Sequence, residues 1–172
     1  MAGDACDAEH VDRALSGVSA VVTALSIPRS SRSPFARITG LVDLHSRSMR
    51  VLLDAMQHHD VQRLVKVSAQ GVGDSASRAG WGFRALVASS NLRPAFVDHA
   101  RADAMVCDSG LAWTVVRPPI LAESAGGASL VASEDAVTWT WTRVSIDDVA
   151  RWVSDAIDDE QTVGRVLTLA PA

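Results

Sequence analysis

Val18-Ser-Ala-Val-Val-Thr-Ala-Leu25 is the stretch that decides the fold of this 172-residue chain. It is almost continuously apolar and rich in β-branched residues, which is typical of a strand buried on both faces in a parallel sheet. Two runs of the same kind follow, at Arg63–Ser68 and Leu111–Val116. Apolar residues at helical spacing separate these runs, over Leu41–His58 and again after Pro94. This alternation predicts an α/β fold with a doubly wound, mainly parallel sheet.

Shorter patterns complete the predicted elements. Asp7 is suited to cap a first helix that Gly17 ends, and Ser145 with Asp148 is typical of the start of the last long helix. The helix after Pro94 is expected to bury Phe96, Ala100, Ala104 and Cys107. The remaining predictions are a short helix at Phe83–Ser89, a strand with one exposed face at Thr138–Thr142, and a final strand at Val166–Ala170.

The composition excludes several classes of protein. Apolar residues make up 48% of the chain and charged residues 21%, which excludes a disordered chain. The formal net charge of −4 argues against a nucleic-acid-binding surface. No apolar run approaches the roughly 18 residues of a membrane-spanning helix. Two cysteines cannot form a disulfide framework and the N-terminus has no signal-peptide pattern, so we expect a cytoplasmic protein without nucleic-acid or membrane partners.

Candidate ligand-binding residues lie where the three predicted strands end. In doubly wound sheets, ligands bind outside the carboxyl ends of the strands. The residues at these ends are Leu25 and Ser26, then Ser68, then Pro118, Pro119 and Ile120. Each also has a plainer interpretation, because a serine after a strand can bind the following loop and prolines can simply end a strand. The residues alone leave both interpretations open.

Four segments carry a resemblance to a known family. They are Gly3–Val22, which begins with Gly3-Asp4 and Asp7, then Val61–Val72, Ser109–Pro119 and Ser145–Ile157. Together they resemble the atypical short-chain dehydrogenase/reductases, and within them the NAD(P)H-binding, NmrA-like group that contains flavin reductase/biliverdin-IXβ reductase. The resemblance implies a Rossmann-like fold that binds NADP or NAD.

The same resemblance implies roles for individual residues. Asp4 is expected near the adenine of the dinucleotide, and the backbone at Leu25 and Ser26 is expected close to the cofactor. Ser68 is expected to contact the nicotinamide or the substrate, beside a wall formed by Pro118–Ile120.

Three further groups of residues have two interpretations each. Trp139 and Trp141 are expected on one side of their strand, where they either stack on a flat flavin or tetrapyrrole substrate or pack against a helix. The arginines of the loop Arg29–Arg37 either bind a phosphate or face solvent. His58 and His59 end a helix, where a cationic histidine favours the helix dipole, so we expect no metal site.

The chain departs from the family in two ways. The family opens with a strand, a Gly-x-x-Gly-x-x-Gly turn and a helix, and this sequence contains none of these. We therefore expect residues 1–172 to form a single, N-terminally truncated domain that lacks the first βαβ unit and binds NAD(P)H weakly by itself. An unpaired edge on strand Val18–Leu25 then predicts homo-oligomers. In addition, Ala95 and His99 replace the Tyr-x-x-x-Lys pair of many members, and the chain has no tyrosine.

Three functions are consistent with these observations. The first is NAD(P)H-dependent reduction of a flavin-like or small carbonyl substrate, in which the cofactor supplies the hydride and the protein supplies position and a dry pocket. The second is a non-catalytic, dinucleotide-sensing regulator. The third is an inactive fragment of such a reductase. Activity with a flavin separates the first function from the second.

Overall fold

In the described part of the chain, the central sheet has five strands in the order β1-β2-β3-β7-β5. A computed structural model describes residues 2–124, 126–137 and 141–172 of the protein. Four of the strands are parallel neighbours, namely β1 (Ala20–Thr23), β2 (Arg63–Val67), β3 (Ala112–Arg117) and β7 (Arg165–Pro171). The fifth strand, β5 (Leu130–Ser133), is antiparallel to β7. These pairings confirm the predicted doubly wound, mainly parallel sheet.

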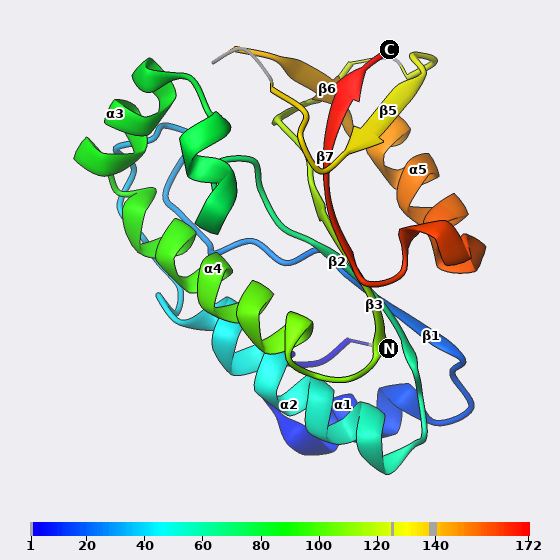
Figure 1. The fold of residues 1–172 in the computed structure, drawn as a ribbon. Coiled ribbons are helices and arrows are strands. Elements are labelled where there is room, and N and C mark those ends of the chain that lie inside the picture. The colour runs from blue at the N-terminus through cyan, green and yellow to red at the C-terminus, as the bar shows by residue number, and fades with distance from the viewer. Residues whose placement is uncertain (1, 125, 138–140) are drawn as a thin grey trace.

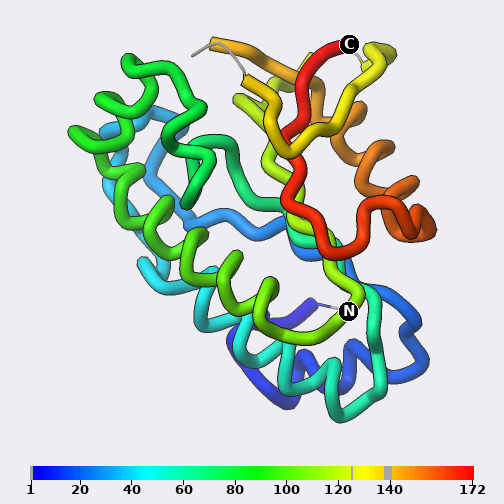
Figure 2. Tube along the Cα trace, in the orientation of Figure 1, coloured from blue at the N-terminus to red at the C-terminus, as the bar shows by residue number. Residues whose placement is uncertain are grey.

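Helices cover both faces of this sheet, as Figure 1 shows. One face is covered by α1 (Ala8–Leu15), α2 (Leu44–His58) and α4 (Arg93–Cys107), and the other by α5 (Ile146–Asp158). The remaining elements are the helix α3 (Trp81–Ser89), the 3₁₀ turns η1 (Gly73–Arg78) and η2 (Glu160–Thr162), and the parallel strand pair β4 (Ile120–Ala122) and β6 (Arg143–Ser145). The path of the chain through these layers can be followed in Figure 2. No helix among the described residues is long and apolar enough to cross a membrane.

Two apolar cores lie on opposite sides of β2 and β3. Leu64 and Val115 belong to the core beneath α1, α2 and α4, whereas Val65 and Val116 belong to the core beneath α5. All four side chains are fully buried. The prediction that β2 and β3 are buried on both faces is therefore confirmed.

The first strand differs from its prediction. Only Ala20–Thr23 pair as β1, and the strand lies at the edge of the sheet, where it contacts β2 alone among the described residues. The side chains of Val22 and Leu25 are 40% and 37% exposed. Burial on both faces was therefore wrong for this strand, because α5 covers the sheet further inward. The free edge itself is as expected.

The helix ends agree with the sequence more closely than the helix faces do. Asp7 caps α1 by accepting a hydrogen bond from the His10 backbone N–H, and Ser145 caps α5 through the N–H of Asp147. Asp148 does not complete a capping box, because its carboxylate accepts from the backbone N–H of Gly127 instead.

The predicted inner face of α4 was wrong. Ala104 and Cys107 are exposed, and the helix buries Asp98, Ala102, Asp103 and Val106. The reason is that the two carboxylates satisfy donors of α2, β2 and β3, so that this face is buried although it is polar. The predicted strand Thr138–Thr142 lies largely outside the described residues.

Candidate functional site

A cavity of about 300 Å³ lies at the carboxyl ends of β1 and β2, between these strands and the helices α1 and α2. Its walls are mainly apolar, with Val21 of β1 and Met49 and Leu52 of α2 among them. Polar side chains also line it, and the two with the least solvent exposure are His45 and Lys66. An apolar hollow with a few convergent polar groups is the usual form of a small-molecule site.

Lys66 is anchored beside this cavity by a buried ionic cluster. The Lys66 Nζ donates to Asp103 Oδ1 at 2.6 Å, while Oδ2 of the same carboxylate accepts from Ser68 Oγ and Arg117 Nη2, both at 3.0 Å. Arg117 also donates to Asp74 of η1 at 2.6 Å. Lys66 and Ser68 point to the same face because alternate residues of an extended chain do so. The cluster therefore ties β2, β3, α4 and η1 together.

A second carboxylate of α4 occupies the N-terminus of α2. Asp98 Oδ2 accepts from the backbone N–H groups of His45 and Ser46, at 2.7 and 3.3 Å. The first N–H groups of a helix have no partner within the helix, and a negative charge there is favourable. Asp98 thus holds His45 at the cavity.

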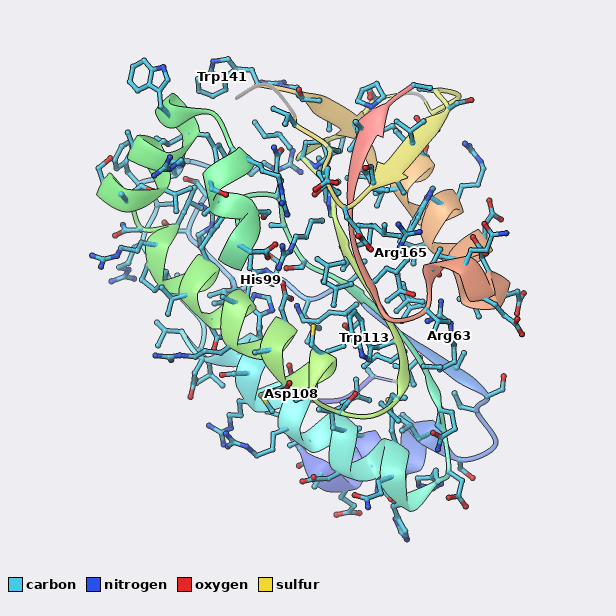
Figure 3. All side chains as sticks on the ribbon, viewed as in Figure 1. Arg63, His99, Asp108, Trp113, Trp141 and Arg165 are labelled. Carbon is cyan, nitrogen blue, oxygen red and sulfur yellow. The ribbon has the colours of Figure 1, made fainter. Side chains whose placement is uncertain are left out.

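Two neutral histidine rings stack beneath this end of α2. The centroids of His45 and His99 are 3.6 Å apart, and Figure 3 shows His99 on α4. Burial lowers the pKa of His45 to about 4 and that of His99 to about 2. His45 Nε2 and His99 Nδ1 are buried without a hydrogen-bond partner among the described residues. Both rings are therefore uncharged near neutral pH.

Lys66 is the only lysine in a chain that carries fifteen arginines. Burial lowers the pKa of its ammonium, although the carboxylate of Asp103 acts in the opposite direction. An arginine would remain charged at any accessible pH, whereas a buried lysine can give up a proton. The single lysine of the chain, whose buried ammonium can release a proton, thus lies in the wall of the cavity.

The sequence-predicted site residues fall into two sets. Asp4 and Leu25 line the cavity, and Ser26 is exposed next to Leu25. Ser68 is buried and its hydroxyl already donates to Asp103. The structure therefore brings the first set to the cavity and places Ser68 in the ionic cluster.

The ends of β2 and β3 do lie side by side, as expected. The Ser68 N–H donates to Val116 O, and the Gln70 N–H donates to Pro118 O. Pro118 and Pro119 are buried, and Ile120 is half-buried where β4 begins. None of these residues lines the cavity, and η1 is held at this end of β3 by the pair Arg117–Asp74.

The two tryptophans proposed to cover a substrate are not at this cavity in the described part of the chain. Trp141 is 68% exposed at the outer end of the molecule, as Figure 3 shows, and Trp139 lies outside the described residues. In the arginine-rich loop, Arg29 donates to the carbonyl of Ser33 and Arg32 pairs with Glu123. The structure therefore assigns no ligand to Trp141 or to the arginines of this loop.

The cavity fits one end of a nicotinamide dinucleotide better than the other. Its apolar walls with a lysine and an imidazole suit a flat ring that carries a carboxamide. A pyrophosphate usually rests on a glycine-rich turn and on free N–H groups at a helix N-terminus. Here the first N–H groups of α1, α2 and α5 are bonded to Asp7, Asp98 and Ser145. The cavity thus fits the nicotinamide end, and among the described residues the two helices that line it, α1 and α2, present N-termini already bonded to a carboxylate rather than free for a phosphate.

Sequence reasoning missed the residues that hold this site together. His45, Asp98, Asp103 and Arg117 were not assigned roles, because the inner face of α4 was placed by apolar residues alone. A single lysine within an apolar strand was a usable signal, since a buried ammonium requires a carboxylate partner. An acidic residue on the helix packed against it was therefore to be expected.

The comparisons with known proteins agree with this architecture. The model of the NAD(P)H-binding family matches residues 1–160. A search of the curated proteins finds no match. The oxidoreductase ylbE from Lactococcus lactis superposes with a TM-score of 0.76 at 17% identity, covering 100% of this chain and 71% of that one.

Two further solved structures are similar. A short-chain dehydrogenase/reductase from Veillonella parvula in complex with NADP has a TM-score of 0.75 at 13% identity, covering 99% of this chain and 70% of that one. ChuY, an anaerobillin reductase from Escherichia coli O157:H7, has a TM-score of 0.73 at 18% identity, covering 98% of this chain and 73% of that one. At these identities the likeness shows a shared Rossmann-like fold.

Proposed function

The chain belongs to the NAD(P)H-binding family, and we propose that its cavity takes the nicotinamide end of NAD(P)H for the reduction of a flavin-like or small carbonyl substrate. The observation that carries this proposal is an apolar cavity at the carboxyl ends of β1 and β2 with Lys66 and His45 in its wall. Ligands of doubly wound sheets bind at this edge. When bound, such a cofactor supplies a hydride, and the protein supplies position and a dry pocket.

Lys66 is the residue to which we assign the polar contact. Its ammonium has three N–H donors, and among the described residues one of them is taken by Asp103. The others are suited to a carboxamide or carbonyl oxygen in the cavity, and Nζ holds a proton that an arginine there would not release. Asp103 acts as a positioning residue, and Ser68 acts through it.

A dinucleotide-sensing role without catalysis is the second candidate. It is favoured by the engagement of the polar groups at the ends of β2 and β3, where Ser68 and Arg117 are already bonded to Asp103. A regulator needs binding alone, whereas a reductase must also hold its substrate against the hydride-donating ring, and the proton of the product can come from solvent or from Lys66. Reduction of a free flavin by NADPH in the presence of the protein separates the two candidates.

Binding of reduced nicotinamide mononucleotide, followed by the emission of its ring, tests the site directly. Because the N-termini of the helices that line the cavity, α1 and α2, are already bonded to Asp7 and Asp98, the mononucleotide and NADPH should bind with similar, weak affinity. Two lost hydrogen bonds to a charged phosphate correspond to about 3–6 kcal/mol, or roughly 10²- to 10⁴-fold. NADPH binding about 100-fold tighter than the mononucleotide would therefore contradict this account.

Two matched substitutions locate the ligand. Leu25→Trp places a large ring at the cavity, where Leu25 is partly exposed, and should abolish mononucleotide binding. Val42→Trp adds the same ring at an exposed position that does not line the cavity and should leave binding unchanged. Equal binding by both variants would place the ligand elsewhere.

A further inference from the structure

Two histidines and one aspartate converge at the end of α2 that lies opposite His45. Asp12 Oδ1 is 2.8 Å from His58 Nδ1 and 2.9 Å from His59 Nε2. One ligand atom from each residue lies within 4.8 Å of the others. We propose that Asp12, His58 and His59 form a zinc-binding site that fastens α1 to the end of α2.

The backbone holds the three side chains from two packed helices. His58 is the last residue of α2, and the N–H of His59 still donates to the Ala55 carbonyl, so that both imidazoles leave an ordered helix end. Asp12 comes from α1, which packs against α2. The ligands therefore converge because of tertiary packing, and the His-His pair in the sequence reveals only part of the set.

The donor set is suited to zinc. Zinc binds imidazole nitrogen and carboxylate oxygen at about 2.0–2.2 Å in tetrahedral geometry, which places neighbouring ligand atoms about 3.3 Å apart. The present distances of 2.8 and 2.9 Å need to open by about half an ångström, and both involve Asp12 Oδ1, so a small rotation of the Asp12 carboxylate away from the two rings is the movement required. Magnesium and calcium prefer oxygen ligands throughout, so two nitrogen donors favour zinc.

The surroundings are favourable for a cation. The C-terminal end of a helix carries partial negative charge from carbonyl groups without partners in the helix. The side chain of His58 is 74% exposed, that of Asp12 43% and that of His59 23%, so an ion can enter from solvent and keep a water as its fourth ligand. The site has access from solvent and ligands ordered by their helices.

A zinc ion here would also act on the wall of the cavity. Val11 and Ala14, which flank Asp12 in α1, line that cavity. An ion that joins Asp12 to the end of α2 would hold this helix in place and stabilise the folded chain, because an unfolded chain does not present the three ligands together. The site itself does not depend on the proposed function, since none of its three ligands lines the cavity.

Calorimetric titration of the full chain with zinc chloride tests the site, after removal of any histidine tag and of bound metal with a chelator. We expect one zinc ion per chain and a higher melting temperature in zinc. His58→Ala, His59→Ala and Asp12→Asn should each weaken binding by more than the roughly 10- to 100-fold that loss of a ligand's hydrogen-bond partner costs. The melting temperature of each variant without zinc shows that it is folded.

His10→Ala is the matched control. His10 is also a histidine of α1 beside a carboxylate, with Nδ1 3.6 Å from Asp7, but no third ligand joins this pair among the described residues. This variant should keep one zinc ion per chain at unchanged affinity. Zinc binding that survives His59→Ala, or that is lost in His10→Ala, would overturn the proposal. So would one ion per two chains, because the ligands would then come from different molecules.

Discussion

Val65 and Lys66 are neighbours in β2 that lie on opposite faces of the sheet, and they are buried to the same degree but differ in chemistry. Val65 faces α5 and is surrounded by apolar residues, including Val116 and Leu169. Lys66, the next residue, is 2% exposed and faces α4, where it meets Asp103. The two residues therefore do not differ in their exposure to solvent. They differ in the partners that surround them, which are apolar for Val65 and ionic for Lys66.

The energetic consequences of the two arrangements differ. A fully buried valine contributes about 1.5–3 kcal/mol through apolar area alone, with little dependence on any single neighbour. A buried ion pair gains little net stability over an apolar pair of the same shape, but loss of one partner leaves an uncompensated charge. Apolar residues on both faces, Val65 and Leu64 among them, thus supply stability, while Asp103 fixes the position of Lys66 and Arg117 at the end of the sheet where ligands bind.

The largest effect is expected on the apolar face. Val65→Asp introduces a carboxylate at a fully buried position of the apolar core beneath α5, at a cost of several kcal/mol. This cost is comparable with the whole stability of a domain, about 5–15 kcal/mol, so the variant should be unfolded by circular dichroism at 25 °C. Val131→Asp, at a half-exposed position of β5, is the control and should remain folded. A cooperative unfolding transition for Val65→Asp near that of wild type would contradict the buried assignment.

The next effect concerns the ionic face. Asp103→Ala removes the carboxylate shared by Lys66 and Arg117 and should reduce the free energy of unfolding by about 3–5 kcal/mol. Asp74→Ala removes an exposed partner of Arg117 and should cost about 1 kcal/mol or less. Urea denaturation measures both.

The double variant Lys66→Met with Asp103→Leu sharpens this test. It removes the buried ammonium together with its carboxylate, whereas Arg117 still loses Asp103 and keeps only Asp74. It should therefore recover the part of the stability lost in Asp103→Ala that comes from the unpaired Lys66. If the double variant is less stable than Asp103→Ala, the ion pair itself contributes net stability, and the contrast between the two faces fails.

The apolar elements were predictable from the sequence because their pattern depends on local chemistry. The β-branched runs of β2 and β3 are buried on both faces, as predicted, since helices cover each side of them. The same pattern in β1 indicated burial that the structure does not show. The apolar, β-branched sequence of β1 is similar to those of β2 and β3, but β1 lies at the edge of the sheet. The sequence of a single strand does not indicate its position within the sheet.

The candidate site was predictable only where it coincides with the ends of strands. Leu25, predicted at the end of the first strand, follows the end of β1 by two residues and lines the cavity, and its contact with a cofactor stays a prediction. Asp98 and Asp103 were missed because apolar periodicity assigns no inward role to a carboxylate. Their burial depends on donors from α2, β2 and β3, which lie far away in the sequence.

A smaller effect is expected from the stacked histidines. Burial lowers the pKa values of His45 and His99 from 6.5 to about 4 and about 2, so the unfolded chain binds these protons at a higher pH than the folded one. The free energy of unfolding is therefore unaffected by these two groups above about pH 6.5. Below that pH it decreases, until the pH has fallen through the pKa values that the histidines have in the folded chain. Each group contributes a slope of up to about 1.4 kcal/mol per pH unit.

His99→Phe isolates this contribution. The phenyl ring can still stack on His45, one titrating group is removed, and the unpartnered Nδ1 disappears. The variant should be at least as stable as wild type at pH 8 and should lose stability less steeply between pH 6.5 and 4 in urea denaturation. Identical slopes for the two proteins would show that His99 is protonated in the folded state.

The smallest effect concerns the two edges of the sheet, which repeat the contrast between apolar and charged surfaces. β1 has no partner on its outer side among the described residues and exposes Val22. β5 also exposes an apolar residue, Val131, but the ion pair Glu134–Arg165 lies beside it. Charged residues at an edge oppose pairing with another chain, and an apolar edge favours it. We therefore expect weak association of two copies through antiparallel β1 strands.

Val22→Lys should raise the dissociation constant of this dimer at least about tenfold, which corresponds to about 1.4 kcal/mol of binding free energy. Sedimentation velocity measures this constant. Val131→Lys on β5 should leave it unchanged, and a larger effect of this second substitution would assign self-association to the opposite edge.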